Sequence, residues 1–357
     1  MSTAINFGTT VSLAEAADLV LANPKTAFLL QGPPGIGKTS LKHAFQRKLG
    51  DTHTVIYFDC INKDLGDVAF IGLNHEKKIA EYFLNGIFQH YTGKPLVIVL
   101  DEFTKAPQPI QNSLHTLLEA SDRRIHDWFL PEGSIVTLTG NMAGDGVGDN
   151  IKAHTIGRIT RVTVRPSTAE EWLAWAVNND VEPVVMAWVN QFPHCLDSYI
   201  LTDVSNNPYP FNPKAPQPAY VSPRSLERVS DILKNRHAVS PNALLAAMIG
   251  TIGESAARDM QAFVDYQDQL PAWRDIIDNP KSCKLPDSDG ACAVLVFGAI
   301  AKVDKQTIAP FMEYVERMSA NWQAVFALNI AKNPAKQSVA FTASKFKDWC
   351  LANEDIL

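Results

Sequence analysis

Short apolar runs, separated by stretches with helical periodicity, organise roughly the first 165 residues of the chain. Uninterrupted apolar or β-branched runs of about four to eight residues are typical of strands buried on both faces of a parallel sheet. Between them, apolar positions recur every three or four residues, as in helices. This alternation predicts an α/β fold whose parallel sheet has helices on both faces. The runs interpreted as strands are residues 26–31, 54–58, 95–102, 134–141 and 158–164.

The segments between these runs predict the remaining elements of this region. Residues 12–22 and 108–120 each carry one apolar helical face, and residues 76–90 are also interpreted as helical. Residues 63–73 contain two glycines and predict a loop with an apolar middle. Residues 123–133 predict a β-hairpin.

Strand patterns disappear after about residue 165, and helical patterns replace them. Ser167 and Glu170 have the spacing of a capping box. Ser222-Pro223 and Ser240-Pro241 each combine a capping residue with a first-turn proline. The second of these helices is expected to reach about residue 269, interrupted by glycines. This change of pattern predicts a domain boundary near residue 165.

The composition is that of a folded protein. Of 357 residues, 46% are hydrophobic and 20% are charged, which excludes a disordered chain. The formal net charge of −6 argues against a general nucleic-acid coat, although a local basic channel stays open. The five cysteines form no Cys-x-x-Cys pair, which is typical of reduced thiols. With no signal-peptide or membrane-span pattern, we expect a cytoplasmic protein.

The first predicted strand runs into a glycine-rich stretch that ends in Lys38 and Thr39. Its spacing is the phosphate-loop pattern, in which glycines let backbone N–H groups surround a polyphosphate at the positive end of a helix. Lys38 is expected to reach the β- and γ-phosphates, and Thr39 to ligate Mg²⁺. The predicted nucleotide-binding residues are Gly32, Pro33, Pro34, Gly35, Ile36, Gly37, Lys38, Thr39 and Ser40.

Two carboxylates, Asp101 and Glu102, end the apolar run that begins at residue 95. Parallel sheets bind ligands at the carboxyl ends of their strands. Asp101 suits a hold on Mg²⁺, directly or through water, and Glu102 suits a base that polarises the attacking water. The alternative is an ordinary strand end with two solvated acids. A phosphate loop upstream favours the catalytic interpretation.

Asn141 ends a further buried strand and is a third polar group at a third strand tip. That place suits a side chain that positions the attacking water, whereas the alternative is an asparagine that only starts the glycine-rich turn behind it. We favour the first interpretation, because the phosphate loop and the two carboxylates end their own strands in the same way.

With these motifs in this order, followed by Arg158 and Arg224, the chain resembles the AAA+ ATPases, and among them the MoxR-type and dynein-related branch. The resemblance is carried by GPPGIGKTS, VIVLDEFTKAPQPIQNSLHTLLEA, IVTLTGNMAGDG and SPRSLERV, within about residues 10–265. It implies a P-loop core over residues 1–165, an all-α lid over residues 166–270 and a helical extension over residues 271–357.

The resemblance also implies roles for the site residues. Asp101 and Glu102 would be the Walker B pair, and Asn141 the first sensor, acting in catalysis together with Lys38. Arg224, which follows Ser-Pro, would be the second sensor and read the γ-phosphate from the lid.

Arg158 would be the arginine finger that completes the site of a neighbouring subunit. The family usually has an aromatic residue after this arginine, whereas Ile159 follows here. Arg161 is therefore the alternative finger, and an ordinary surface arginine is the alternative for both.

A finger acting between subunits implies a homo-oligomeric ring, most often of six subunits in this family, that uses ATP and Mg²⁺. Members of this branch remodel protein partners, often one with a von Willebrand A domain. Their pore-facing segments correspond here to residues 64–73 and 123–133, where Phe70 or Trp128 would contact a threaded chain.

Two other function classes stay open. A nucleic-acid translocating or loading motor would use Arg123 and Arg124 to line a basic pore, and its binding would weaken with salt. A switch module would hold nucleotide without turnover, which the presence of both acids and Asn141 disfavours. A GTPase is disfavoured because no Asn-Lys-x-Asp stretch is present.

Overall fold

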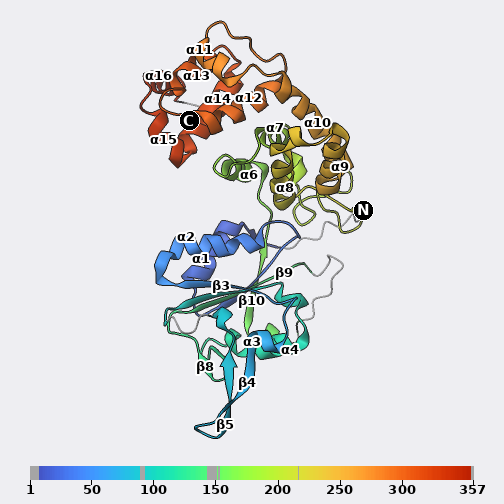
Figure 1. Ribbon diagram of the computed structural model, residues 1–357, viewed down its shortest axis with the longest axis vertical. Helices are drawn as coiled ribbons and strands as arrows, with labels where there is room; N and C mark the ends of the chain where they lie inside the picture. The colour runs from blue at the N-terminus through green and yellow to red at the C-terminus, as the bar shows by residue number, and fades with distance from the viewer. Residues whose placement is uncertain (1–7, 89–92, 143–150, 152, 216, 355–357) are drawn as a thin grey trace. The chain divides into compact units, whose positions relative to one another are not determined.

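Six parallel strands form the central sheet in the first part of the chain (Figure 1). The computed structural model describes residues 8–88, 93–142, 151, 153–215 and 217–354. The strands of this sheet are β1 Thr10–Val11, β2 Ala27–Gln31, β3 Thr54–Asp59, β6 Leu96–Asp101, β9 Ile135–Gly140 and β10 Ile159–Val164. Their order is β1, β10, β2, β9, β6, β3, and each neighbouring pair is parallel. The expected α/β fold is thereby confirmed.

Helices cover both faces of the sheet because its strands carry apolar side chains on both sides. The helices of this part are α1 Leu13–Ala22, α2 Leu41–Leu49, α3 Leu65–Val68, α4 Gln108–Ser113 and α5 Ala153–Ile156. Alternate residues of β6 point to opposite faces. Val97 and Val99 pack with α1 and α2, whereas Ile98 and Leu100 pack with α4. Figure 1 shows α1 and α2 on one side of the sheet and α3 and α4 on the other.

Of the predicted helices, residues 12–22 are confirmed and residues 108–120 are shorter than expected. Ser12 caps α1 and forms a capping box with Glu15. Helix α4 ends at Ser113, and a 3₁₀ turn over His115–Leu118 follows it. The predicted apolar face is nevertheless buried. The apolar side chains of this segment are therefore buried although part of it is a 3₁₀ turn and not an α-helix.

The helix predicted over residues 76–90 is wrong for Ile79–Leu84, which form strand β5; residues 89 and 90 lie outside the described part of the chain. The loop predicted over residues 63–73 is also wrong, because α3 is followed there by strand β4, Ala69–Asn74. The two strands pair antiparallel over six residues each. Between them Lys78 has φ 57°, a turn conformation that no helix can contain.

The second hairpin, predicted within residues 123–133, is confirmed. Strand β7, Arg124–Ile125, pairs antiparallel with β8, Trp128–Phe129. His126 between them has φ 51°, the left-handed conformation that a tight hairpin turn requires.

The chain divides by its contacts into two compact units. The first runs to Pro166 and also holds Ser198–Asp203, and the second holds Ser167–Asp197 and Val204–Leu357. Within the described residues, no helix is both long enough and apolar enough to cross a membrane.

The second unit is helical, as expected. A single apolar core joins its early and late helices, so the subdivision near residue 270 stays a prediction. Its helices are α6 Ala169–Ala176, α7 Pro183–Gln191, α8 Pro223–Lys234, α9 Pro241–Ile252, α10 Glu254–Gln269, α11 Trp273–Asp278, α12 Asp289–Lys302, α13 Ile308–Val315, α14 Ala320–Lys332, α15 Pro334–Ala340 and α16 Ser344–Ala352.

The ends of these helices correct two details of the sequence interpretation. The capping box of α6 is formed by Thr168 and Glu171, one residue later than predicted, because the Thr168 hydroxyl accepts the Glu171 N–H. Ser222 and Ser240 cap α8 and α9 as expected. Gly250 lies inside α9, and only Gly253, with φ 86°, separates α9 from α10.

Candidate functional site

The phosphate-loop residues connect β2 to α2, where the backbone needs glycine at several positions. Gly35 and Gly37 have φ values of 79° and 91°, which side chains with a Cβ rarely adopt. A Cβ on Gly32 would lie 2.4 Å from the Val164 carbonyl oxygen. The loop therefore has the curled conformation in which backbone N–H groups can surround an anion.

Lys38 is buried in this loop, with 5% of its surface exposed. Its ammonium group donates to the carbonyl oxygens of Gly32 at 2.8 Å and Pro33 at 3.0 Å, and to Asn141 Oδ1 at 2.9 Å. A buried charge is tolerated only when hydrogen bonds replace water. The structure thus brings Lys38 and Asn141 together, although 103 positions separate them in the chain.

Asp101 lies at the carboxyl end of β6 and is 6% exposed. Both of its carboxylate oxygens accept hydrogen bonds from neighbouring strands: Oδ2 from the Tyr57 hydroxyl of β3, and Oδ1 from the Thr139 hydroxyl of β9. The orientation of the carboxylate is therefore fixed from both sides.

Glu102 leaves the strand in a left-handed conformation, with φ 51° and ψ 35°. This conformation costs a residue with a Cβ about 1–2 kcal/mol. Its backbone N–H donates to Thr139 Oγ1 at 3.0 Å, and its carboxylate forms an ion pair of 2.7 Å with Lys105. Strained residues of this kind cluster at functional sites, where the surrounding contacts hold them.

Two other titratable groups near Asp101 stay protonated. Burial, together with the hydrogen bond to Asp101, raises the pKa of Tyr57 well above its usual value. Burial and the charges of Asp101 and Asp59 likewise raise the pKa of the Cys60 thiol. Neither group is a base or nucleophile near neutral pH.

The residues at this edge fit a nucleotide-bound Mg²⁺ ion better than an ion held by protein alone. In the described part of the chain, no three His, Cys, Asp or Glu side chains gather into a metal-binding group. Thr39 and Asp101 both contact the Tyr57 hydroxyl, so a hydroxyl and a carboxylate lie near each other. Mg²⁺ is commonly held by one or two carboxylates together with substrate phosphates.

Arg158 lies just before strand β10, at the amino ends of the parallel strands and not at their carboxyl ends. The next residue, Ile159, pairs with Ala27 at the start of β2, whereas the phosphate loop follows Gln31 at its end. At about 3.3 Å per residue, the start and the end of β2 are roughly 13 Å apart. Arg158 also forms an ion pair of 2.9 Å with Glu119. A role in phosphate chemistry therefore requires the site of another chain.

Of the other two predicted arginines, one lies within the sheet and the other belongs to the second unit. Arg161 lies in the middle of β10, opposite Leu29, and is exposed. Arg224 is exposed in the first turn of α8, in the second unit. Its contact with the nucleotide stays a prediction.

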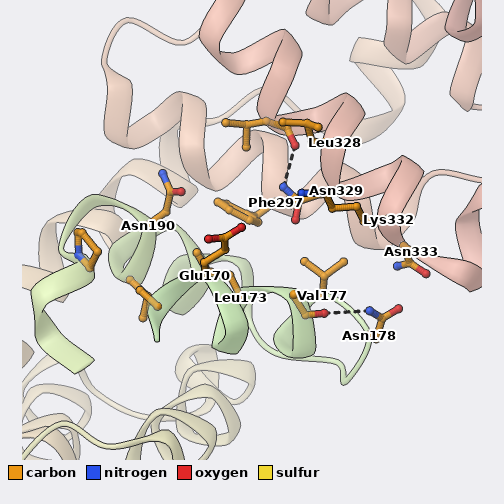
Figure 2. A pocket seen from close by; sticks show the side chains of 15 residues that line it. Glu170, Leu173, Val177, Asn178, Asn190, Phe297, Leu328, Asn329, Lys332 and Asn333 are labelled. Carbon is orange, nitrogen blue, oxygen red and sulfur yellow. Dashed lines mark hydrogen bonds between the residues drawn. The ribbon is translucent and has the colours of Figure 1, made fainter. Parts of the chain in front are cut away.

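The second unit has a hollow of about 330 Å³ (Figure 2). Leu173 of α6 and Val177, the residue after that helix, face Phe297 of α12 there, and Glu170 and Lys332 add opposite charges. None of the residues predicted for the nucleotide site, all of which the structure describes, lines this hollow.

Sequence reasoning missed Tyr57 and Thr139, which hold Asp101. Each carried a signal, because its polar group comes two residues before another polar residue at the end of a strand. Such pairs lie on the same face of a strand. Whether such a pair reaches the site depends on which strands are neighbours in the sheet. The structure gives this strand order, and the sequence does not.

Residues 27–130 match the family model of the AAA domain, dynein-related subfamily. No curated protein matches the chain. Among solved structures, a candidate ATPase of Cytophaga hutchinsonii is 13% identical, with a TM-score of 0.34, over 74% of this chain and 91% of that chain. A RuvB mutant of Thermotoga maritima is 15% identical, with a TM-score of 0.33, over 76% of this chain and 75% of that chain. The matched segment contains the phosphate loop and the Asp101-Glu102 stretch, and over these residues it confirms the resemblance to the AAA domain of the dynein-related subfamily.

Proposed function

We propose that this chain is a Mg²⁺-dependent ATPase of the AAA+ class, which acts as a homo-oligomeric ring and remodels a protein partner. The observation that carries the proposal is the convergence of polar groups at the carboxyl edge of the sheet. Lys38 meets Asn141 at 2.9 Å, and Thr139 of the same strand holds Asp101. Three strands thus supply a cation, an amide and a carboxylate to one place.

Phosphate binding follows from the loop and from Lys38. The backbone N–H groups of residues 32–40 and the start of α2 favour an anion. The neutral acceptors that now hold the Lys38 ammonium are weaker partners than a charged phosphate oxygen. Lys38 therefore donates to the β- and γ-phosphates instead of these carbonyl oxygens, and its side chain stays buried.

Thr39 and Asp101 are the residues that would hold Mg²⁺, Thr39 through its hydroxyl and Asp101 through its carboxylate. When bound, the ion neutralises charge that develops on the phosphate oxygens. Asp101 keeps its orientation because Tyr57 and Thr139 each donate to one of its oxygens.

Glu102 and Asn141 act on the attacking water. Glu102 accepts its proton as a general base, and for this its carboxylate gives up the ion pair with Lys105. The Asn141 amide orients the water from the neighbouring strand tip. Arg224 of the second unit contributes a charge for the γ-phosphate in our proposal.

The ring is inferred from Arg158. It lies at the edge of the sheet opposite the phosphate loop, so it can complete only the site of a neighbouring chain. An arginine supplied in this way accelerates phosphoryl transfer by about 10³–10⁵. Arg161 is the alternative, and six subunits is the number that the family resemblance favours.

The β4–β5 hairpin favours a protein partner. Its exposed apolar side chains lie on both faces of the hairpin, and on one face Phe70 stacks on Phe83, with ring centroids 5.5 Å apart. Exposed apolar patches mark sites of protein contact. The exposed apolar side chains of the hairpin are Phe70, Ile71, Leu73, Ile79, Tyr82 and Phe83. A partner with a von Willebrand A domain remains our specific candidate.

The nucleic-acid motor is the second candidate, and the contacts of its arginines disfavour it. Arg123 donates to the carbonyl oxygens of Pro24 and Ser134, at 2.5 and 2.7 Å. Arg124 pairs with Asp122 at 3.1 Å and stacks over Phe129. Stimulation of hydrolysis by DNA, lost at high salt, would favour this candidate over protein remodelling.

The proposed activity is tested with Glu102→Gln. Loss of the general base is expected to lower the rate of ATP hydrolysis by about 10²–10⁴ while ATP still binds. Glu132→Gln, at an exposed glutamate of the same unit, is the control and keeps the parental rate. Hydrolysis by Glu102→Gln at the parental rate would contradict the catalytic assignment.

A further inference from the structure

Tyr57 lies on β3, the edge strand of the sheet, beside the strand that ends in Asp101. Its hydroxyl group donates to Asp101 Oδ2. The Thr39 side chain hydrogen-bonds to the same hydroxyl group. Tyr57 therefore joins the two residues that would hold Mg²⁺, which come from the phosphate loop and from β6.

The direction of these hydrogen bonds follows from the number of protons. An ionised carboxylate can only accept, so the single Tyr57 proton points to Asp101. The Thr39 hydroxyl must then donate its own proton to the Tyr57 oxygen. Hydrogen bonds in such a chain polarise one another.

Asp101 is held in the same manner from its other side. The Thr139 hydroxyl donates to Asp101 Oδ1 and accepts the Glu102 backbone N–H at 3.0 Å. Asp101 is thus fixed by one hydroxyl from each neighbouring strand. The Tyr57 hydroxyl contacts both Asp101 and Thr39, so it can set the distance between the Thr39 hydroxyl and the Asp101 carboxylate.

We propose that Tyr57 is a positioning residue, which orders Thr39 and Asp101 as a pair for a nucleotide-bound divalent cation. This inference rests on the proposed function and adds a residue to it. A residue that orients metal ligands contributes to metal affinity, and its loss typically costs about 10- to 100-fold in that affinity. A residue that only packs an edge strand would affect stability and leave metal affinity unchanged.

The test compares Tyr57→Phe with Tyr82→Phe, an equal substitution on the exposed β4–β5 hairpin. Both keep the aromatic ring and lose one hydroxyl group. ATP binding is measured by calorimetry, first in EDTA and then at increasing concentrations of free Mg²⁺. The readout is the Mg²⁺ concentration at which the tightening of ATP binding is half complete.

For Tyr57→Phe, we expect this midpoint to rise by about 10- to 100-fold, with ATP affinity in EDTA unchanged. Tyr82→Phe keeps the parental midpoint. A parental midpoint for Tyr57→Phe, in a chain whose ATP binding Mg²⁺ does tighten, overturns the role of Tyr57 alone. Absence of any ATP binding by the unmodified chain overturns the proposed function, and this inference with it.

Discussion

The two units of the chain present their candidate site residues in opposite ways. In the first, Lys38, Asp101 and Asn141 come from distant positions, yet all are buried or held by hydrogen bonds at one edge of the sheet. In the second, Arg224 is exposed at the start of a helix. A parallel sheet gathers the ends of its strands by geometry alone. A helical unit has no comparable device, so the place of Arg224 depends on how the units meet.

The largest expected effect concerns Arg158, which lies in the first unit but outside its cluster. Arg158→Ala should lower ATP hydrolysis by about 10³–10⁵ with ATP affinity unchanged, because a finger acts on the transition state. The fold should persist, since an exposed ion pair such as that with Glu119 contributes about 0–1 kcal/mol. Steady-state hydrolysis and calorimetry measure the two quantities.

Mixing experiments then separate action between subunits from other losses. Arg158→Ala keeps its phosphate loop, and Lys38→Ala keeps its finger, so a mixed ring contains interfaces with both parts. Activity should return on mixing. Two inactive variants that stay inactive together, or an Arg161→Ala variant that loses as much activity alone, would contradict the assignment.

The next effect concerns the β4–β5 hairpin, the exposed part of the first unit. Phe70 is 57% exposed, so Phe70→Ser should leave the basal rate of hydrolysis intact. Loss of an aromatic residue that is a hot spot of an interface costs about 2–4 kcal/mol, and we assign this role to Phe70. Stimulation of hydrolysis by an unfolded polypeptide such as casein should therefore require roughly 30- to 1,000-fold more polypeptide.

Leu351→Ser, which changes a similarly exposed apolar residue of α16, is the matched control for the hairpin. It should leave the stimulation as it is. Equal stimulation of the parental protein and Phe70→Ser would remove the hairpin from the partner interface.

The smallest expected effect concerns Arg123 and Arg124, and it distinguishes arginines that stabilise the fold from arginines that bind nucleic acid. Burial lowers the pKa of the Arg123 guanidinium, which bonds two backbone carbonyls. Arg123→Ala should reduce the free energy of unfolding by about 1–3 kcal/mol. Arg124→Ala, which breaks an exposed pair with Asp122, should cost about 0–1 kcal/mol. If Arg123→Ala instead leaves stability intact and abolishes DNA binding, the nucleic-acid motor gains support.

The sequence predicted the site best where the functional residues lie at a fixed spacing along the chain. The phosphate loop has fixed positions, and the apolar run before Asp101 predicts a strand whose last residue lies at the ligand edge. Tyr57 could not be predicted, because its meeting with Asp101 depends on β3 lying next to β6. The same limit applies to Thr139, since β9 lies between β2 and β6.

The β4–β5 hairpin was mispredicted for a different reason. Periodicity identifies an element by the face that it buries. Both strands of this hairpin expose most of their large apolar side chains, so no buried face set the pattern. The residue of the turn that has a positive φ is Lys78, and not a glycine or asparagine. Periodicity therefore does not predict the secondary structure of an apolar segment that contacts a partner instead of the core.

Equilibrium binding of ATP to the purified chain in the presence of Mg²⁺ tests the central claim most directly. We predict one ATP bound per chain by calorimetry, with binding weakened by about 2–5 kcal/mol in Lys38→Ala, because the phosphates lose a buried charged partner. Lys48→Ala, at an exposed lysine of α2, should bind as the parental chain does. An unmodified chain that binds no ATP, or a Lys38→Ala chain that binds as tightly as the parent, would contradict the account.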